Sequence, residues 1–484
     1  MADQAIPVEH LQKFYINGQW VNPDGRTLFK VINPGTEEVV GEIAMGNAVD
    51  VDRAVTAARA AFVTYSETSR EQRLTLLRRI LDAYNARYDD FGRAMSVEMG
   101  APKRLAIDAQ AWCGRAHFEE MIDALAKFEF ETPRGTGLVR REPVGVVGCI
   151  TPWNWPINQI VCKVAPALAA GCTIILKPAE VSPLSALLFA EVLHDAGVPP
   201  GVFNLINGDG ATVGHAMSAH PGIDMMSITG STRAGIDVAK TGADTIKRVH
   251  LELGGKSANI ILDDADLEEA VTNGVNFCFN NAGQTCAAPT RMFVPAALHD
   301  RAAEIAKRQA ESFKVGDTWD DATTMGPMAS EQHYNRVQSM IAAGIKEGAQ
   351  LVTGGLGRPE GVNRGYFVRP TVFSHVEPGM RIAREEIFGP VLSILSYKDE
   401  ADAIRLANDT VYGLGAYISG KDMTRTRRVA AKMRAGYVTI NYAPYDVRVP
   451  FGGYKQSGNG REYSDFGLSE FLELKGIVGY APAA

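Results

Sequence analysis

The chain has 484 residues, 46% of them hydrophobic, which is enough for two or three domains that each bury a sizeable core. Its 49 lysines and arginines stand against 56 aspartates and glutamates, a net charge of −7 without dense basic clusters. This balance argues against nucleic acid or an anionic membrane as a partner and favours a soluble enzyme.

The six cysteines include no Cys-x-x-Cys pair, so neither a zinc cage nor a thioredoxin-like motif is indicated, and no metal site is expected. Residues 1–10 have no basic region followed by an apolar run and therefore do not form a secretory signal. The longest apolar run, 164–176, is too short to span a bilayer. We expect a cytoplasmic protein with reduced thiols.

The chain opens with an expected β-hairpin. Two short β-type runs flank Asn17 and Gly18, the residue pair that best tolerates the positive φ angles of a type I′ turn. From about residue 50 to 128 the apolar residues recur at helical spacing, and Ser69 and Gln72 predict a capping box at one helix start. This region is expected to form amphipathic helices that pack against the rest of the fold and contain no catalytic residues.

The middle of the chain predicts a parallel sheet. Short apolar runs separated by helical stretches indicate a doubly wound α/β fold, and a second series of such runs indicates a second α/β domain. The first series lies at 144–150, 173–176, 202–206, 225–228 and 247–251, and the second at 258–262, 290–294, 391–395 and 437–440. The polar-apolar segment 128–142 and the tail are expected to form a small protruding sheet, whose edges need covering by another subunit.

Three strand ends of the first series carry unusual residues, and ligands on such sheets bind beyond these ends. Asn154 lies in a loop fixed by two prolines and two tryptophans, where its amide could donate to a substrate oxygen or simply staple the loop. Lys177 and Glu180 could hold ribose hydroxyls or form a solvated salt bridge. The glycine-rich turn 229–235 could receive a phosphate, although it matches neither a P-loop nor the dinucleotide fingerprint.

Two further residues are candidates for catalysis. Glu252 stands isolated between leucines, where desolvation would raise the pKa of its carboxyl toward the range of a general base, unless the carboxylate pairs with Lys256. Cys286 follows Gly-Gln-Thr among small residues, which leaves its sulfur open to approach. Taken alone, a free cysteine is more often a buried packing residue, and Cys278 is expected to be one.

Read together, these segments resemble the NAD(P)-dependent aldehyde dehydrogenase superfamily, over about residues 14 to 480. Seven motifs occur in the order and spacing of that family, namely Thr-Pro-Trp-Asn-Trp-Pro, Lys-Pro-Ala-Glu, Thr-Gly-Ser-Thr, Glu-Leu-Gly-Gly-Lys, Gly-Gln-Thr-Cys, Glu-Glu-Ile-Phe-Gly-Pro and Pro-Phe-Gly-Gly-Tyr-Lys-Gln-Ser-Gly. The resemblance implies a non-acylating enzyme that oxidises an aldehyde to the free acid, because members that pass the acyl group to coenzyme A lack a glutamate at the Glu252 position.

The resemblance also implies roles for individual residues. Cys286 is the implied nucleophile, passing through a thiohemiacetal and a thioester, with Asn154 and the Cys286 N–H as oxyanion donors and Glu252 as the base. Glu462 and Lys177 are candidates for a proton relay. The cofactor is expected to be NAD rather than NADP, because a carboxylate at Glu180 would repel a 2′-phosphate. The implied cofactor-binding residues are Ile150, Trp153, Lys177, Glu180, Gly210, Gly230, Ser231, Glu386 and Phe388.

The implied architecture has three parts. Residues 1–122 and 143–252 form a Rossmann-like cofactor-binding domain, residues 253–460 a catalytic domain, and residues 123–142 and 461–484 an oligomerisation segment. A homodimer or homotetramer is expected. Pro289 departs from the small or polar residue that the family often has there, which puts the backbone after the nucleophile in question.

The substrate is expected to be an uncharged aliphatic or aromatic aldehyde, since the positions implied for its pocket contain no fixed charge. Arg291 and Arg448 could still reach in, so a semialdehyde or betaine-type aldehyde remains an alternative. From other classes, a cysteine thioesterase would leave the cofactor motifs unexplained, and a non-catalytic binding protein would be expected to lack Cys286 or Glu252. The implied pocket residues are Trp155, Gln159, Cys162, Thr285, Ala287 and Tyr445.

Overall fold

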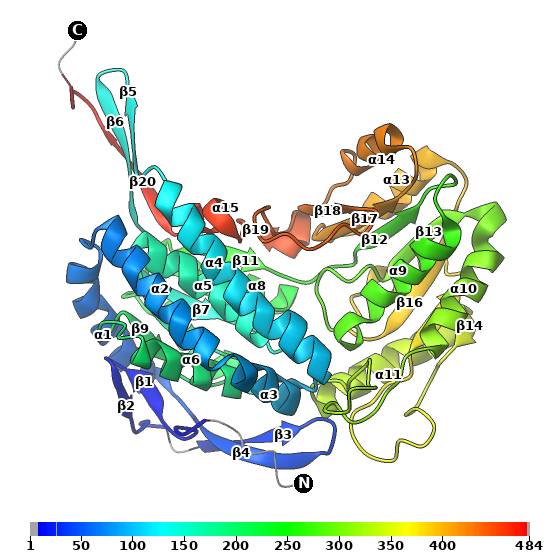
Figure 1. Ribbon diagram of the computed structural model, residues 1–484, viewed down its shortest axis with the longest axis horizontal. Coiled ribbons are helices and arrows are strands. Elements are labelled where there is room, and N and C mark those ends of the chain that lie inside the picture. Colours follow the sequence, from blue (N-terminus) through cyan, green and yellow to red (C-terminus); the bar gives the residue numbers. More distant parts are fainter. Residues whose placement is uncertain (1–7, 26, 482–484) are drawn as a thin grey trace.

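The computed structural model describes residues 8–25 and 27–481, so the predictions about the first seven residues lie outside it. The chain forms two α/β lobes that lie side by side, with a thin three-stranded sheet projecting from the first lobe (Figure 1). This arrangement confirms the predicted class, a doubly wound sheet with a second α/β unit and a small additional sheet. Among the described residues, no helix is long and apolar enough to cross a membrane.

The first lobe is built on an eight-stranded sheet with the order β19-β11-β10-β7-β8-β9-β1-β2. Its five central strands are parallel, whereas β19 and the β1–β2 hairpin pair antiparallel at the two ends. Asn17 and Gly18 have φ angles of 53° and 74°, as predicted for the hairpin turn. The strands are β1 (Phe14–Ile16), β2 (Gln19–Val21), β7 (Val146–Ile150), β8 (Thr173–Lys177), β9 (Phe203–Leu205), β10 (Met225–Thr229), β11 (Arg248–Glu252) and β19 (Gly458–Asn459).

Helices cover both faces of this sheet, and each face has its own apolar core. Ser69 accepts from the Gln72 N–H and the Gln72 side chain accepts from the Ser69 N–H, which confirms the predicted capping box. Deep burial of β7 and β8 explains why they read as unbroken apolar runs. The helices of the lobe are α1 (Ala48–Tyr65), α2 (Arg70–Ala86), α3 (Tyr88–Met99), α4 (Trp112–Lys127), α5 (Pro156–Ala170), α6 (Leu184–Asp195), α7 (His215–Ala219) and α8 (Thr232–Gly242), with π-helical turns at Leu105–Ala111 and Gly210–Gly214.

The second lobe is built on a seven-stranded sheet with the order β14-β15-β16-β13-β12-β17-β18, parallel except for β14. Its strands are β12 (Ala258–Ile261), β13 (Arg291–Pro295), β14 (Gln350–Thr353), β15 (Thr371–Ser374), β16 (Val391–Tyr397), β17 (Gly415–Ser419) and β18 (Tyr437–Ile440). Its helices are α9 (Leu267–Phe279), α10 (His299–Glu311), α11 (Glu331–Lys346), α12 (Arg381–Arg384), α13 (Glu400–Asn408) and α14 (Met423–Ala430). Three of these strands, β14, β15 and β17, were missed, because serine, threonine or glycine interrupts each short apolar run.

Two small sheets and one helix complete the fold. Strands β3 (Thr27–Asn33) and β4 (Glu38–Met45) pair with each other at the base of the first lobe. The projecting sheet has the order β20-β6-β5, with strands β5 (Glu131–Arg134), β6 (Gly137–Pro143) and β20 (Leu472–Ile477), which confirms the predicted pairing of 128–142 with the tail. Helix α15 (Ser464–Glu470) packs on α4 and α5.

The boundaries drawn from the sequence cut across some of these elements. The limit at residue 122 falls inside α4, and β19 pairs with β11 in the first sheet although it lies within 253–460. Helix α15 packs on the first lobe although it lies within 461–484. Elements of the last 30 residues therefore pack in the first lobe, most of which comes from the N-terminal half of the chain.

Candidate active site

The candidate residues lie where the two lobes meet. Strands β7, β8, β10 and β11 end at Ile150, Lys177, Thr229 and Glu252, so their carboxyl ends share one edge of the first sheet. Across from that edge, Trp153 makes an edge-on contact with Phe388 of the second lobe, with ring centroids 5.5 Å apart. This is the edge at which ligands of parallel sheets bind.

Cys286 follows α9 and a short turn at Asn280–Gly283, and its side chain is partly accessible. Burial raises the pKa of its thiol above the ordinary range, and the nearby carboxylates of Glu252 and Glu386 raise it further. The resting form is therefore the thiol, which needs a base before it can act as a nucleophile. Within the described ranges 8–25 and 27–481, the Cys286 N–H donates to no other group.

Asn154 is buried, and its side-chain amide donates to the Gln284 carbonyl at 3.0 Å. That hydrogen bond joins the loop after β7 to the loop that carries Cys286. Trp155 makes a second link, because its indole N–H donates to Thr285 Oγ1 at 3.0 Å. The structure thus places the predicted amide donor beside the predicted nucleophile.

Glu252 is buried, and neither of its carboxylate oxygens accepts a hydrogen bond from the described part of the chain. The pairing with Lys256 that the sequence left open is not formed. The imidazole of His250 lies beside the carboxyl, with Nε2 3.5 Å from Glu252 Oε1, and burial lowers the pKa of His250 to about 4. Burial raises the pKa of Glu252 well above its usual value, and the Glu462 carboxylate raises it further. A buried carboxyl whose pKa is raised binds a proton more readily than an exposed one, which suits it to general acid–base work.

The pKa of Glu462 is shifted in the opposite direction to that of Glu252, because Glu462 has a buried cation as a partner. Lys163 Nζ lies 2.5 Å from Glu462 Oε1, and the positive charge outweighs burial and lowers the pKa of Glu462. Cys162 donates its thiol to the other oxygen at 3.3 Å. The pKa values of two neighbouring carboxyls, Glu252 and Glu462, are therefore shifted in opposite directions.

The two residues expected as candidates for a proton relay, Glu462 and Lys177, have different partners in the structure. Lys177 Nζ donates to the carbonyls of Pro178 and Gly208, both at 2.8 Å, and lies 3.8 Å from Glu180. The lysine that contacts Glu462 is Lys163. Its sequence signal was a single charge within the apolar helix α5, which is a weak signal because long side chains at such positions often reach solvent.

The implied cofactor residues gather along the sheet edge and the facing loop. Ser231 caps α8 by accepting from the Ala234 N–H, while Gly230 donates to Glu252 O. Gly210 opens the π-helical turn and has open space where a side chain would lie. Glu386 accepts the Gly255 N–H at 2.9 Å, and burial raises the pKa of its carboxyl to about 7.

Several buried polar groups at this edge have no partner within the described residues. They are the side chains of Thr151 after β7, Asn207 after β9 and Thr229 at the end of β10. Buried polar atoms normally find a hydrogen bond, so this edge is chemically incomplete without a polar ligand. Together with the carboxylate of Glu180 and the helix start at Ser231, these groups fit a ligand that carries hydroxyls and phosphates.

A cluster of apolar and aromatic side chains surrounds Cys286. Cys162, Ala287, Leu414, Phe451 and Tyr463 form its buried part. Tyr463 stacks on Phe451 with ring centroids 5.2 Å apart, and Tyr445 contacts Tyr463 edge-on at 6.0 Å. Tyr445 also contacts Trp112 at 6.4 Å. Phe451, Tyr463 and Trp112 were not among the predicted pocket residues, whereas Cys162, Ala287 and Tyr445 were.

Gln159 lies in the first turn of α5, buried and with its side-chain oxygen unpartnered within the described residues. Pro289 is accommodated between two turn hydrogen bonds, from Ala288 N–H to Thr285 O and from Thr290 N–H to Ala288 O. The backbone after the nucleophile is therefore an ordinary turn. Cys278 is fully buried in the core of the second lobe, as expected for a packing residue.

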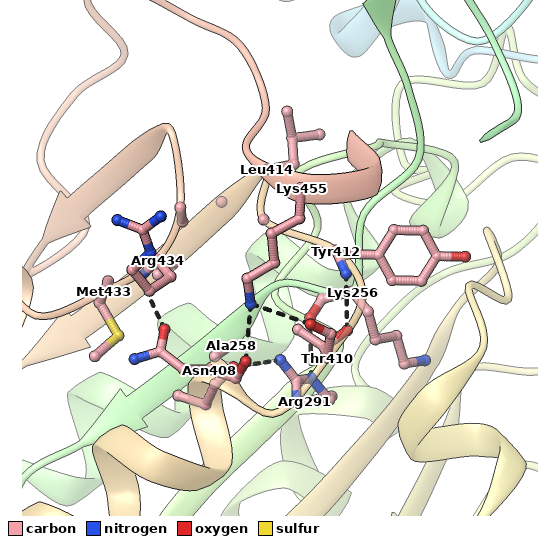
Figure 2. A pocket seen from close by; sticks show the side chains of 15 residues that line it. Lys256, Ala258, Arg291, Asn408, Thr410, Tyr412, Leu414, Met433, Arg434 and Lys455 are labelled. Carbon is pink, nitrogen blue, oxygen red and sulfur yellow. Dashed lines mark hydrogen bonds between the residues drawn. The ribbon is translucent and has the colours of Figure 1, made fainter. Parts of the chain in front are cut away.

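The two arginines that could have reached the pocket are engaged elsewhere. Arg291 lines a separate pocket with Lys256 and Lys455 (Figure 2). Its guanidinium donates to the carbonyls of Lys256, Leu406 and Ala407. Arg448 is exposed and forms a two-pronged ion pair with Asp446, both contacts at 2.8 Å. Arg291 is thus held by three backbone carbonyls, whereas a substrate would have to compete with Asp446 for Arg448.

The fold and the site define a two-lobed α/β protein in which a partly accessible cysteine lies opposite a sheet edge of the kind that binds nucleotides. The chain belongs to the aldehyde dehydrogenase family, whose model matches residues 20–477. This membership agrees with the resemblance carried by the seven motifs.

Three relatives place the chain within the family. A 3-succinoylsemialdehyde-pyridine dehydrogenase from Pseudomonas sp is 53% identical over 470 residues, which are 97% of this chain and 98% of the relative. A mutant of aldehyde dehydrogenase C from Pseudomonas syringae, solved in complex with NAD+ and octanal, is 52% identical with a TM-score of 0.99, covering 99% of this chain and 100% of that chain. Betaine aldehyde dehydrogenase from Staphylococcus aureus, solved in complex with NAD+, is 36% identical with a TM-score of 0.94, covering 98% and 96%.

Proposed function

We propose that this protein oxidises an uncharged aliphatic or aromatic aldehyde to its carboxylic acid with NAD+, through a covalent intermediate on Cys286. The observation that carries the proposal is the convergence of three groups. The Glu252 carboxylate is close enough to Cys286 to raise the pKa of its thiol, and the Asn154 amide is tied to the loop that carries Cys286.

The chain's own residues supply the acyl chemistry. Glu252 accepts the thiol proton, and the Cys286 thiolate adds to the aldehyde carbon to give a thiohemiacetal. The Asn154 side-chain N–H and the Cys286 N–H stabilise the oxyanion. When bound, NAD+ would supply the hydride acceptor, and loss of hydride from the thiohemiacetal carbon would leave a thioester on Cys286. Once Glu252 has lost the first proton to solvent, it takes a proton from water, whose oxygen attacks the thioester. The C–S bond then breaks, which releases the acid and returns Cys286 as the thiolate.

NAD+ fits the groups at the sheet edge. Lys177 and Glu180 would hold the adenosine ribose, and the start of α8 at Ser231 would receive the pyrophosphate. Glu386 would hold the nicotinamide ribose beside Phe388. Because Glu180 is a carboxylate, a 2′-phosphate in its place would meet like charge, which supports NAD+ over NADP+.

The surroundings of Cys286 support an uncharged substrate. The rings of Tyr463, Phe451, Tyr445 and Trp112 offer apolar surface. The free carboxylate of a semialdehyde would have to compete with Asp446 for Arg448, and Arg291 is held by backbone carbonyls. Octanal, named with the Pseudomonas syringae relative, is an aldehyde of this kind. Aromatic rings also recognise quaternary ammonium groups, so a betaine-type aldehyde is the second candidate.

A panel of aldehydes tests this proposal. Octanal, benzaldehyde, succinic semialdehyde and betaine aldehyde are each offered with NAD+ and with NADP+, and the absorbance of the reduced cofactor is followed. We expect kcat/KM for octanal and benzaldehyde to exceed that for succinic semialdehyde by about 100-fold or more, since an unpaired charge is costly to bury. Faster turnover of betaine aldehyde selects the second candidate, and no turnover of any aldehyde contradicts the proposed function.

We also infer that the projecting sheet joins copies of the chain into a homodimer or homotetramer. Leu474 on β20 is 70% exposed, and the edge strands β20 and β5 of this sheet are unpaired on their outer sides within the described residues. Such edges are normally covered, and a second copy would cover them. Light scattering after size exclusion should show a multimer that Leu474→Glu shifts toward monomer, whereas Val63→Glu on α1, at a side chain 71% exposed, leaves it intact. A monomeric wild-type chain would contradict this inference.

A further inference from the structure

The turn before Cys286 has an unusual backbone. Asn281, Ala282 and Gly283 have φ angles of 53°, 55° and 73°, three consecutive residues in the left-handed region. Side chains rarely adopt this conformation, and asparagine tolerates it better than most residues. The turn is therefore constrained at the point where it directs the chain toward the nucleophile.

The Asn281 side chain lies inside this turn and bridges two loops. It is buried, and its Nδ2 donates to the Asn154 carbonyl at 2.8 Å and to the Gln284 carbonyl at 3.2 Å. The Asn154 side-chain amide donates to the same Gln284 carbonyl. One amide thus contacts both the backbone of Asn154 and the acceptor that orients the Asn154 side chain.

Two further amides hold the bridge in place. Gln110 Nε2 lies 3.3 Å from Asn281 Oδ1 and 3.4 Å from the Asn154 carbonyl. The Gln284 side chain donates to the carbonyls of Asn281 and Pro327 and accepts from the Ala329 N–H. The orientation of the Asn281 amide is therefore fixed by partners on both of its ends.

This bridge controls where the second N–H of Asn154 can point. The amide nitrogen of Asn154 has two hydrogens, and the Gln284 carbonyl accepts one of them. The direction of the other is set by the position of that carbonyl relative to the Asn154 backbone, and Asn281 binds both. A small displacement of an oxyanion donor costs much of its effect, because such groups act only when they are already in place.

We propose that Asn281 is a positioning residue for the oxyanion site, which sets the geometry between the Asn154 amide and the Cys286 N–H. The proposal rests on the proposed function, because it assigns the residue that positions the oxyanion donors of that reaction. Asn281 itself touches neither substrate nor cofactor in this scheme.

The test separates donor geometry from folding. Asn281→Gly keeps a residue that accepts a positive φ but removes the amide, and Asn281→Asp keeps the shape but cannot donate. Asn280→Gly is the matched control, because Asn280 is exposed and adjacent. We expect kcat/KM for octanal to fall by about 100-fold in both Asn281 variants, as when an oxyanion donor is lost, and to stay within about twofold in the control.

Alkylation of Cys286 by iodoacetamide is the second readout. That reaction develops no oxyanion, so its rate should stay within about threefold of wild type in the same variants. A loss of alkylation that parallels the loss of turnover would mean that Asn281 only maintains the fold, and would overturn the proposal.

A double-mutant cycle gives the third readout. If Asn281 acts through Asn154, adding Asn281→Gly to Asn154→Ala should cost less than about threefold more in kcat/KM, whereas independent roles would multiply. Full multiplication of the two losses, or an Asn281→Gly variant as active as Asn280→Gly, overturns the inference alone. Absence of aldehyde turnover by the wild-type chain overturns the proposed function itself.

Discussion

Replacing Cys286 by alanine should abolish aldehyde oxidation while leaving NAD+ binding within about twofold of wild type. The thiol is the group that would form the covalent bond to the aldehyde carbon, and Cys286 is the one described cysteine that is not buried. We expect a fall of at least about 10⁴-fold in kcat, measured from the absorbance of the reduced cofactor. NAD+ binding is followed by quenching of tryptophan fluorescence.

Cys278→Ala is the matched control for this variant. Cys278 lies in the same stretch but is fully buried, and burial raises the pKa of its thiol to about 12, so it should be chemically inert. Its alanine variant is expected to lose stability rather than activity per folded molecule. Full activity of Cys286→Ala would exclude Cys286 as the nucleophile.

Replacing Glu252 by glutamine should slow release of the acid most strongly, by about 10² to 10⁴-fold in steady-state kcat, the usual contribution of a general base. Glutamine keeps the shape of the side chain but cannot accept a proton. If Glu252 mainly deprotonates the attacking water, the Glu252→Gln variant should still give a first burst of reduced cofactor, followed by slow turnover. If it also takes the thiol proton, the burst itself should slow.

The pH profile gives an independent check on Glu252. A base works when it is deprotonated, and burial together with Glu462 raises the pKa of Glu252, so wild-type activity should fall as the pH drops through that raised value. The fall in activity at low pH should disappear in Glu252→Gln. It should persist in Glu470→Gln, where the replaced side chain is a half-buried carboxylate on α15. An unchanged steady-state rate in an assay limited by acid release would argue against the role.

Local sequence signals predicted the frame of the fold well. The turn at Asn17 and Gly18, the capping box at Ser69 and the buried central strands each depend on residues close together in the chain. Strands β15 and β17 were not predicted, because strands this short carry little periodic signal. The assignment of β17 (Gly415–Ser419) depends on its pairing with β12 and β18.

The site was predicted as a set of motifs but not as a set of contacts. Sequence order placed Glu252, Cys286 and Asn154 in recognisable motifs, whereas nothing in it shows which lysine meets Glu462. Lys163 is 299 residues away from Glu462 along the chain, and the choice between Lys163 and Lys177 is made by the packing of α15 on α5. Asn281 was missed for the same reason, because its importance depends on carbonyls presented by a distant loop.

The Lys163–Glu462 pair also limits how early the first lobe can finish folding during synthesis. Lys163 leaves the ribosome 299 residues before its counter-charge, an interval of roughly 15 to 60 s at ordinary elongation rates. Throughout that interval α5 must be only partly assembled or must keep its ammonium hydrated, because an unpaired buried charge is costly. The first lobe, although most of it is translated first, can therefore complete its interior only when the end of the chain has emerged.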